Sequence, residues 1–322
     1  MDLLKEIQLL DESSSLNEVL TIVEIDFKKL ARIENKKFNE ILENVENTEL
    51  RYDEKGNSIF NWFNWRKVNT IIEESGGPDA WKEYFSPDNC WSCQNLSNIY
   101  NCLGWGVKPY SDTINSFITI YSFALLIYYP DDFYFDDRIN SVRVLENGIR
   151  KKQIVSEKYL LSLSNQNNNY RFEDFDEVNN LKPIQLLAQL THSFGNFMPC
   201  PDPPYNKIKG ISSDIKDFLD LMLNKIINNK RIMGVTVSEE KYWKEWFEDK
   251  NENLLIDEKD YQLINDVKSF DGMHKEEFRQ LLNKIIARIR IRGLKIVGKI
   301  NMCKDVQKKC EELIKRERKI LY

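Results

Sequence analysis

Apolar residues recur at steps of three and four along most of this chain, which is the spacing that lines one face of an α-helix. The pattern is clearest over residues 16–31, over 278–289 and again over about 303–319. A chain of 322 residues is long enough to bury a core without disulfides or a metal. The sequence therefore predicts a mostly helical protein whose helices pack around a single core.

Residues typical of helix ends divide this pattern into segments. Ser15 and Asp112 stand where a side chain can cap the first turn of a helix. The helix expected after Asp112 is strongly apolar and ends at Pro130, while Pro183 suits the first turn of a further helix. We expect Gly293 to end the long helix near the C-terminus.

One stretch departs from the helical spacing. Residues from about 131 to 182 are acidic and irregular, and they contain short β-like runs at 141–145 and 153–155. We therefore expect a small β excursion here, and long aromatic-rich loops over 62–105, where five tryptophans fall. The predicted organisation is an N-terminal helical segment, a mostly helical main domain and a basic C-terminal helix, over 1–50, 51–293 and 294–322.

The expected compartment is the cytoplasm. The acidic, amphipathic N-terminus does not resemble a secretory signal. The most apolar segment, 114–129, is shorter than the roughly 20 residues that a membrane-spanning helix needs. Six cysteines in a chain of this kind indicate reduced thiols.

Charge is unevenly distributed. The whole chain carries a net charge of −5, which argues against a surface coated in basic residues for duplex nucleic acid. Residues 284–322, however, hold thirteen Lys or Arg against four Asp or Glu. This basic C-terminus either packs against the acidic body or contacts nucleic acid or another acidic partner. The second alternative would use Arg288, Arg290, Arg292, Lys295 and Lys299.

The candidate catalytic residues surround one of only two histidines, His192 and His274. A helix is expected to end near His192, and Asn196, beside a glycine, can turn the chain or offer its amide to a ligand. A histidine at such a place is either a buried capping residue or part of a site. The site hypothesis takes His192, Asn196, Asn206 and Asp112 as catalytic residues that face a shared polar cleft.

These residues also carry a resemblance. The run from Asp112 to Phe117, the run from His192 to Asn196 with its following prolines, and Asn206 with Gly210 resemble an uncharacterised family of bacterial proteins common in Firmicutes. A helix over 215–226 and the pair Arg292-Gly293 fit the same pattern, which covers about residues 60–295. The resemblance implies an intracellular bacterial protein and supplies no activity.

A shorter stretch is similar to HNH-type restriction nucleases. Gly195-Asn196-Phe197 and Asn206 would match the Gly-Asn segment and the downstream Asn of those enzymes. HNH nucleases use an upstream histidine to activate water near a metal. No histidine precedes His192 in this chain, so the base of that mechanism is missing.

Two further groups are candidate metal ligands. Cys90 and Cys93 have the two-residue gap that lets thiolates share one zinc, with Cys102 nearby and either Cys200 or His192 as a distant fourth ligand. The acidic runs 131–137 and 172–177 carry carboxylates that suit Mg²⁺ or Ca²⁺, although such runs are usually solvated loops. Zinc and magnesium are therefore the cofactors considered.

Candidate ligand-binding residues lie beside the expected cleft. Trp62 and Trp65 either form a stacking platform or belong to the core, and Asn115 follows the expected cap. The chain has no phosphate-binding loop, dinucleotide fingerprint, nucleophile elbow or kinase signature. We therefore expect a binding or interaction protein, in phage defence or the stress response. The alternative is a metal-dependent nuclease or other nucleic-acid-processing enzyme centred on His192, and whether the protein is an enzyme stays open.

Overall fold

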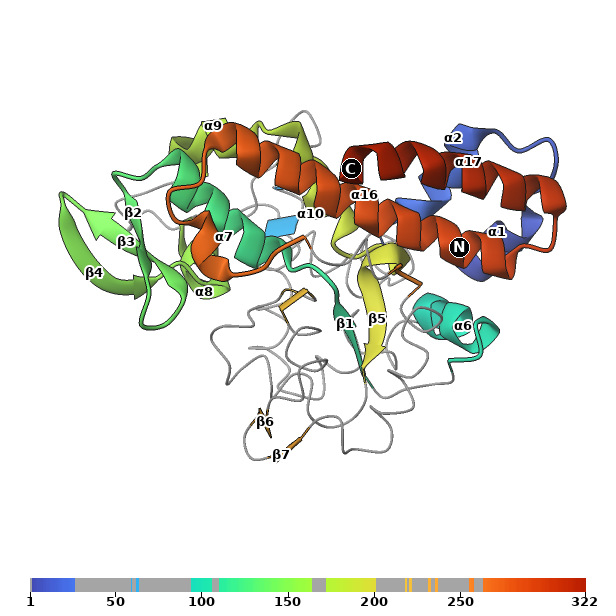
Figure 1. Cartoon of the computed structure of the whole chain (residues 1–322), viewed down its shortest axis with the longest axis horizontal. Helices are drawn as coiled ribbons and strands as arrows, with labels where there is room; N and C mark the ends of the chain where they lie inside the picture. Colours follow the sequence, from blue (N-terminus) through green and yellow to red (C-terminus); the bar gives the residue numbers. More distant parts are fainter. Residues whose placement is uncertain are drawn as a thin grey trace, which may run out of the picture.

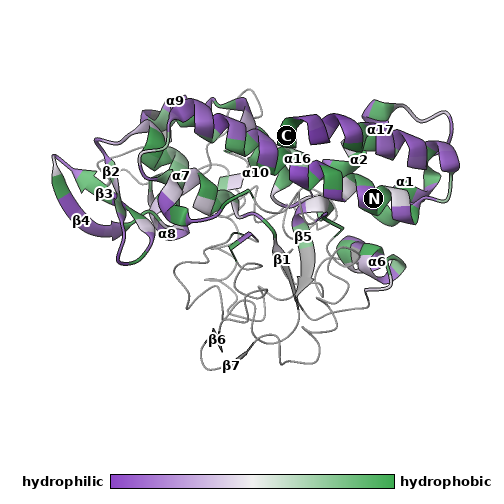
Figure 2. Ribbon diagram, viewed as in Figure 1, coloured by the Kyte–Doolittle hydropathy of each residue, from purple (hydrophilic) through white to green (hydrophobic). Residues whose placement is uncertain are grey.

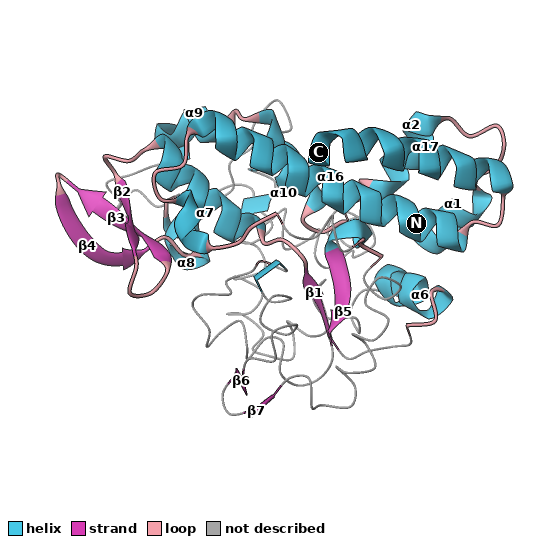
Figure 3. Ribbon diagram, in the orientation of Figure 1, coloured by secondary structure: helices cyan, strands magenta, loops and turns pink. Residues whose placement is uncertain are grey.

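The computed structural model confirms the mostly helical class with a small β excursion (Figures 1 and 3). The segments that the structure describes lie along the whole length of the chain. They are residues 2–26, 59, 62–63, 94–105, 110–163, 172–200, 218, 220–221, 231–232, 235–236, 255–257 and 263–322.

The longest helix, α16 (Lys275–Ile300), forms the axis of the described structure, and α17 (Lys304–Leu321) returns beside it (Figure 1). From Ile285 to Val297 nearly every residue of α16 is buried, because other elements contact it on all sides. At 26 residues it is about 39 Å long, enough to link distant parts of the protein.

Two short N-terminal helices, α1 (Leu3–Leu9) and α2 (Leu16–Val23), pack against α16, and α2 also packs against α17. Ser15 caps α2 as predicted: its side chain accepts from the Glu18 amide, and the Glu18 carboxylate accepts from the Ser15 amide. The Asn301 side chain, between α16 and α17, donates to the carbonyls of Ile7 and Leu10 at 2.7 and 2.9 Å. Together with α6 (Gln94–Cys102), these elements enclose one apolar cluster.

A second apolar cluster surrounds α7 (Phe117–Tyr128), which is buried on nearly all sides. The ring of Phe123 stacks on Phe270 of the short 3-10 helix η4 (Val267–Phe270) at a centroid distance of 4.2 Å. The N-terminal half of α16 lines this cluster, and its C-terminal half lines the other. Among the described residues, further helices around the second cluster are α8 (Glu157–Ser162), η1 (Phe172–Phe175), α9 (Asp176–Asn179) and α10 (Lys182–Leu190).

The predicted β excursion is a three-stranded antiparallel sheet at one end of the described structure (Figure 1). The strands β2 (Phe133–Asp136), β3 (Ser141–Glu146) and β4 (Ile149–Ile154) follow one another as a meander. Asn147 and Gly148 connect the last two with φ values of 51° and 73°. Two positive φ values in a two-residue loop are typical of a type I′ turn, which Asn-Gly favours.

Two shorter pairings lie elsewhere. Strand β1 (Tyr110–Thr113) pairs antiparallel with β5 (Phe197–Cys200), directly after the 3-10 turn η2 (Phe194–Asn196). Strands β6 (Arg231–Ile232) and β7 (Val235–Thr236) form a minimal hairpin. The β1–β5 pair brings the two segments of the sequence resemblance side by side (Figure 1).

Two predicted helix boundaries are wrong. Asp112 does not cap α7, because it pairs with Met198 within β1, and Ser116 occupies the N-cap position instead. Gly293 does not end α16, which continues to Ile300 and so crosses the expected domain boundary at 293/294. Glycine is required there by packing rather than by a turn, since a Cβ at Gly293 would lie 2.5 Å from Cγ1 of Val23.

The N-terminal helical segment is described as far as residue 26, and both of its helices there were expected. The helix expected over 215–226 falls mostly outside the described residues. Within the described part of the chain, no helix combines the length and the apolar composition needed to cross a membrane.

Candidate functional site

The turn after α10 holds the predicted His192 and Asn196 inside the protein. The helix ends at Leu190, and the chain passes through Thr191, His192 and Ser193 into η2. The His192 side chain packs beside Phe197, with ring centroids 5.9 Å apart, and the residue is only 4% exposed. The hydroxyls of Thr191 and Ser193 donate to carbonyls of α10, so these two side chains are satisfied by their own helix.

Asn196 and Asn115 form a reciprocal contact below this turn. The Asn196 side-chain oxygen accepts from the backbone and side-chain amides of Asn115 at 3.0 and 3.2 Å. Its side-chain nitrogen donates to the carbonyls of Asn115 and Thr191 at 3.0 and 2.9 Å. Both residues are fully buried. The Asn196 carboxamide therefore joins β1 to the end of α10, where an unpaired polar backbone group would be costly.

Arg288 of α16 extends this contact to a third region of the chain. Its Nη2 donates to the side-chain oxygen of Asn115 at 2.5 Å, and its Nη1 pairs with the carboxylate of Asp220 at 2.5 Å. The same Asp220 oxygen accepts from the backbone amide of Leu263 at 2.8 Å. We call Asn115, Asn196, Asp220 and Arg288 the buried polar joint. The guanidinium is neutralised inside the protein, as a buried charge requires.

Arg292, one turn further along α16, holds η2 in place. Its Nη1 donates to the carbonyls of Phe194 and Gly195 at 3.0 and 3.1 Å, and also to that of Phe197. The guanidinium carbon lies 5.5 Å from the ring centre of Trp105. Burial lowers the pKa of Arg292 to about 10, so the side chain stays charged at neutral pH. A Cβ on Gly195 would lie 2.3 Å from the Ile289 carbonyl, so only glycine allows this close approach.

Arg290 points to a different side of α16 and joins two carboxylates. It pairs with Glu24, after α2, at 2.6 Å and with Glu317 of α17 at 3.4 Å. The pKa of Glu317 is raised above its usual value. Burial is the main cause, and the nearby Glu24 charge acts in the same direction, while the Arg290 charge opposes them. This arginine therefore ties α2, α16 and α17 together.

The basic C-terminus thus packs largely against the acidic body. Lys295 pairs with Asp257 at 2.8 Å, and Arg318 pairs with the same carboxylate. The expected contact with nucleic acid through Arg288 and Arg292 is not supported, because both guanidinium groups are buried and bound to protein groups. Lys299 stays exposed.

Apart from Lys299, the exposed basic residues after Gly293 lie on α17. Lys304, Lys308, Lys315 and Lys319 are all exposed and follow one another at steps of four, seven and four residues. In an α-helix these steps keep the side chains within one stripe on the outer face. We call these residues the lysine stripe, and Figure 2 draws α17 largely in purple. The spacing of these lysines is visible in the sequence, but the prediction placed the contact with an acidic partner on the basic residues of α16.

The other predicted site residues divide into buried, exposed and undescribed ones. Trp62 belongs to the core, with its ring 5.1 Å from Phe117, so it offers no exposed stacking platform. Cys102 is an exposed free thiol and His274 is exposed before α16. Trp65, Asn206, Cys90 and Cys93 lie outside the described residues, and nothing is described for the side chains of Asp112 and Cys200.

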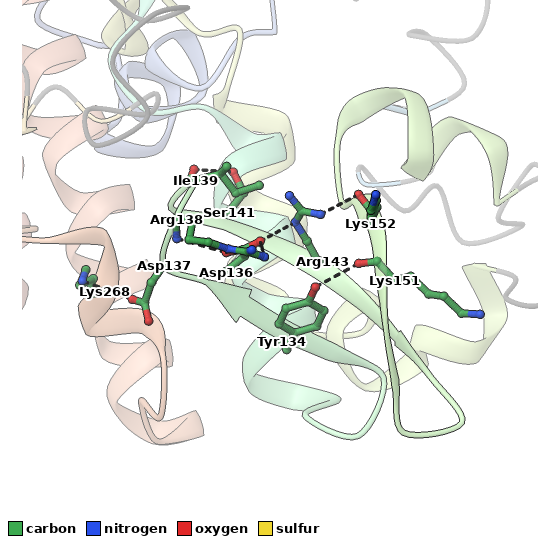
Figure 4. Close-up of polar contacts among 10 residues, drawn as sticks. All are labelled: Tyr134, Asp136, Asp137, Arg138, Ile139, Ser141, Arg143, Lys151, Lys152 and Lys268. Carbon is green, nitrogen blue, oxygen red and sulfur yellow. Dashed lines mark hydrogen bonds and ion pairs between the residues drawn. The ribbon is translucent and has the colours of Figure 1, made fainter.

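No group of three or more His, Cys, Asp or Glu side chains that could hold a metal occurs among the described residues. In the acidic run 131–137, Asp136 is buried and bound by Arg138 and Arg143, and Asp137 pairs with Lys268 at 3.3 Å (Figure 4). Asp136 therefore serves ion pairs within the sheet, and Asp137 serves an exposed ion pair between the sheet and η4.

The sheet carries a surface that the sequence analysis did not single out. Arg150, Lys151 and Lys152 follow one another on β4, at the edge of the sheet. Tyr134 and Arg143 reach the backbone of this strand from the neighbouring strands (Figure 4). The Asn-Gly pair between two β-like runs was the signal that could have identified the hairpin.

Comparison of the chain with protein-family models, with curated proteins and with solved structures gives no match in any of the three.

Proposed function

We propose that this chain is a cytoplasmic bacterial binding protein that holds an acidic partner on the lysine stripe of α17. The observation that carries the proposal is the exposure of Lys304, Lys308, Lys315 and Lys319 along one face, while Arg288 and Arg292 of α16 are engaged inside. The proposed setting is phage defence or the stress response.

The structure of the stripe suits a polyanion. Over the fifteen steps from Lys304 to Lys319 the helix rises about 22 Å, which would let several lysines meet successive charges on an extended partner. Within the stripe region, Asp305 pairs with Lys308 and Glu312 pairs with Arg316. Exposed ion pairs of this kind are weak, so a partner with a high charge density can replace them.

The burial of His192 and of the buried polar joint argues against catalysis at His192 and so favours a binding protein. A catalytic group needs to reach the reacting atoms. His192 and Asn196 are sealed under α16, and the Asn196 amide is fully engaged by Asn115 and Thr191. In this proposal the residues that resemble a site hold the architecture together.

The test measures binding of a labelled 20-base-pair DNA duplex and of polyglutamate by fluorescence anisotropy at several salt concentrations. K315Q/K319Q should weaken binding of at least one probe, and for DNA the slope of log affinity against log salt should fall by about 2. The matched control is K158Q/K182Q, which removes two exposed lysines far from α17 along the chain. Equal binding by both double variants would contradict the proposal.

The same samples test the enzymatic alternative. Each nucleic-acid probe is incubated with Mg²⁺, Mn²⁺ or Zn²⁺ and the products are separated on a gel. Cleavage that is lost in His192→Ala, while the far-ultraviolet circular dichroism spectrum is retained, would establish a nuclease centred on His192 in place of the binding protein.

A further inference from the structure

Strand β4 is an exposed edge. It is the outer strand of the order β2-β3-β4, and five of its six residues are exposed. Its two end residues are large and apolar, yet Ile149 is 61% exposed and Ile154 is 39% exposed. An edge strand presents backbone N–H and C=O groups on its outer side, where a further strand can pair.

Side chains of β2 and β3 hold β4 in place where its pairing with β3 changes register. The register shifts between Arg143 and Leu145, so residues 151–153 bulge opposite β3. The Tyr134 hydroxyl donates to the Lys151 carbonyl at 3.0 Å, and Nη1 of Arg143 donates to the Lys152 carbonyl at 3.1 Å (Figure 4). These bonds compensate for the interrupted ladder and hold the strand in one shape.

The strand is also strongly basic. Arg150 lies over the ring of Tyr134, with its guanidinium carbon 4.9 Å from the ring centre, and Lys152 is exposed. Only Lys151 has a carboxylate of the hairpin nearby, Glu146 at 2.8 Å. Three adjacent positive charges on an edge oppose pairing with the same edge of a second copy, because like charges would face one another.

We propose that β4 docks an extended, acidic segment of a partner protein as a fourth strand of the sheet. The backbone of the segment pairs with the outer edge of β4. Its carboxylates lie on the face that carries Arg150, and its apolar side chains lie on the opposite face, beside Ile149. The two exposed isoleucines favour a protein segment over nucleic acid, whose phosphates would leave them uncovered. This surface is separate from α17, so the inference goes beyond the lysine stripe.

The probe is a fluorescent twelve-residue peptide that alternates glutamate with valine, compared with the same peptide carrying lysine for glutamate. The intact protein should bind the acidic peptide, and R150E/K152E should weaken that binding by about tenfold. The matched control K5E/K182E makes the same change of charge at two exposed lysines outside β4 and α17, and should bind as the original protein does. A loss in K315E/K319E with no loss in R150E/K152E would assign the peptide to the lysine stripe and overturn this inference alone.

Hydrogen–deuterium exchange tests whether a strand is added. The peptide should slow exchange of the backbone amides of 149–154, because their outer hydrogen bonds are then made to peptide rather than to water. Binding without this protection, no preference for the acidic peptide, or displacement of the peptide by a 20-base-pair DNA duplex would each overturn the proposal. Size-exclusion chromatography of R150E/K152E confirms that the variant is folded and compact.

Discussion

The two C-terminal helices carry similar numbers of basic residues but direct them oppositely. Eight Lys or Arg lie on α16 and seven on α17. Arg288 and Arg292 of α16 are buried, Arg290 is half-buried, and each of the three holds several acceptors. Four lysines of α17 point to solvent. Arginine suits the buried role because its planar group makes several directed bonds, whereas a lysine ammonium is strongly hydrated. Charge in the sequence therefore does not by itself identify a binding surface.

The largest change in the free energy of unfolding is expected from a buried arginine of α16. Arg288→Met should lower the free energy of unfolding by about 3–5 kcal/mol, because Asp220 is left as an uncompensated buried charge. Urea denaturation measures the loss, with Lys315→Met as the matched change on α17. Adding Asp220→Asn should restore part of the stability, and a loss below about 1 kcal/mol would contradict the role of the joint.

Asn196→Ala tests the neighbouring amide in the joint. The change leaves the buried amide of Asn115 and the carbonyl of Thr191 without this partner, and should cost about 2 kcal/mol. The midpoint of urea denaturation reports the effect. A change of similar size in nucleic-acid or peptide affinity, at unchanged stability, would instead favour a ligand-binding role for Asn196.

A smaller effect concerns the carboxylates around Arg290. Because burial raises the pKa of Glu317 in the folded state, the native protein binds this proton more readily than the unfolded chain does. The free energy of unfolding should therefore fall as pH rises from about 4.5 through the folded pKa. Glu317→Gln should remove this part of the pH dependence. A constant difference between the two proteins from pH 4 to pH 7 would contradict the assignment.

The smallest effect is expected on the exposed stripe. K315A/K319A should change the free energy of unfolding by less than about 0.5 kcal/mol, because neither side chain is buried. Thermal denaturation checks this value. A large loss would mean that the stripe is structural, and the contrast between the two helices would then disappear.

Local signals predicted much of the architecture. The cap at Ser15, the start of α10 beside Pro183 and the β-like runs around the Asn-Gly turn all depend on neighbours within a few residues. The errors at Asp112 and Gly293 arose from partners far along the chain. Asp112 pairs with Met198, and Gly293 leaves space for Val23, so no local pattern could reveal either contact.

The candidate site was predicted in part. The sequence indicated that the segments around Asn115 and Asn196 belong together, and the structure places them in direct contact. It did not indicate that a helix near residue 290 would cover them, because burial of a polar residue depends on the complete tertiary structure. Asp220, the charged partner of Arg288, had no motif that could mark it.

The central position of α16 affects how the chain folds during synthesis. α2 ends at Val23, yet the helix against which it packs ends at Ile300, about 280 residues later. At 5–20 residues per second, the ribosome needs roughly 15–55 seconds to supply the missing surface. Throughout that interval the early helices keep an apolar side uncovered in a crowded cell. A newly made chain is therefore a natural client for chaperones until its last quarter emerges.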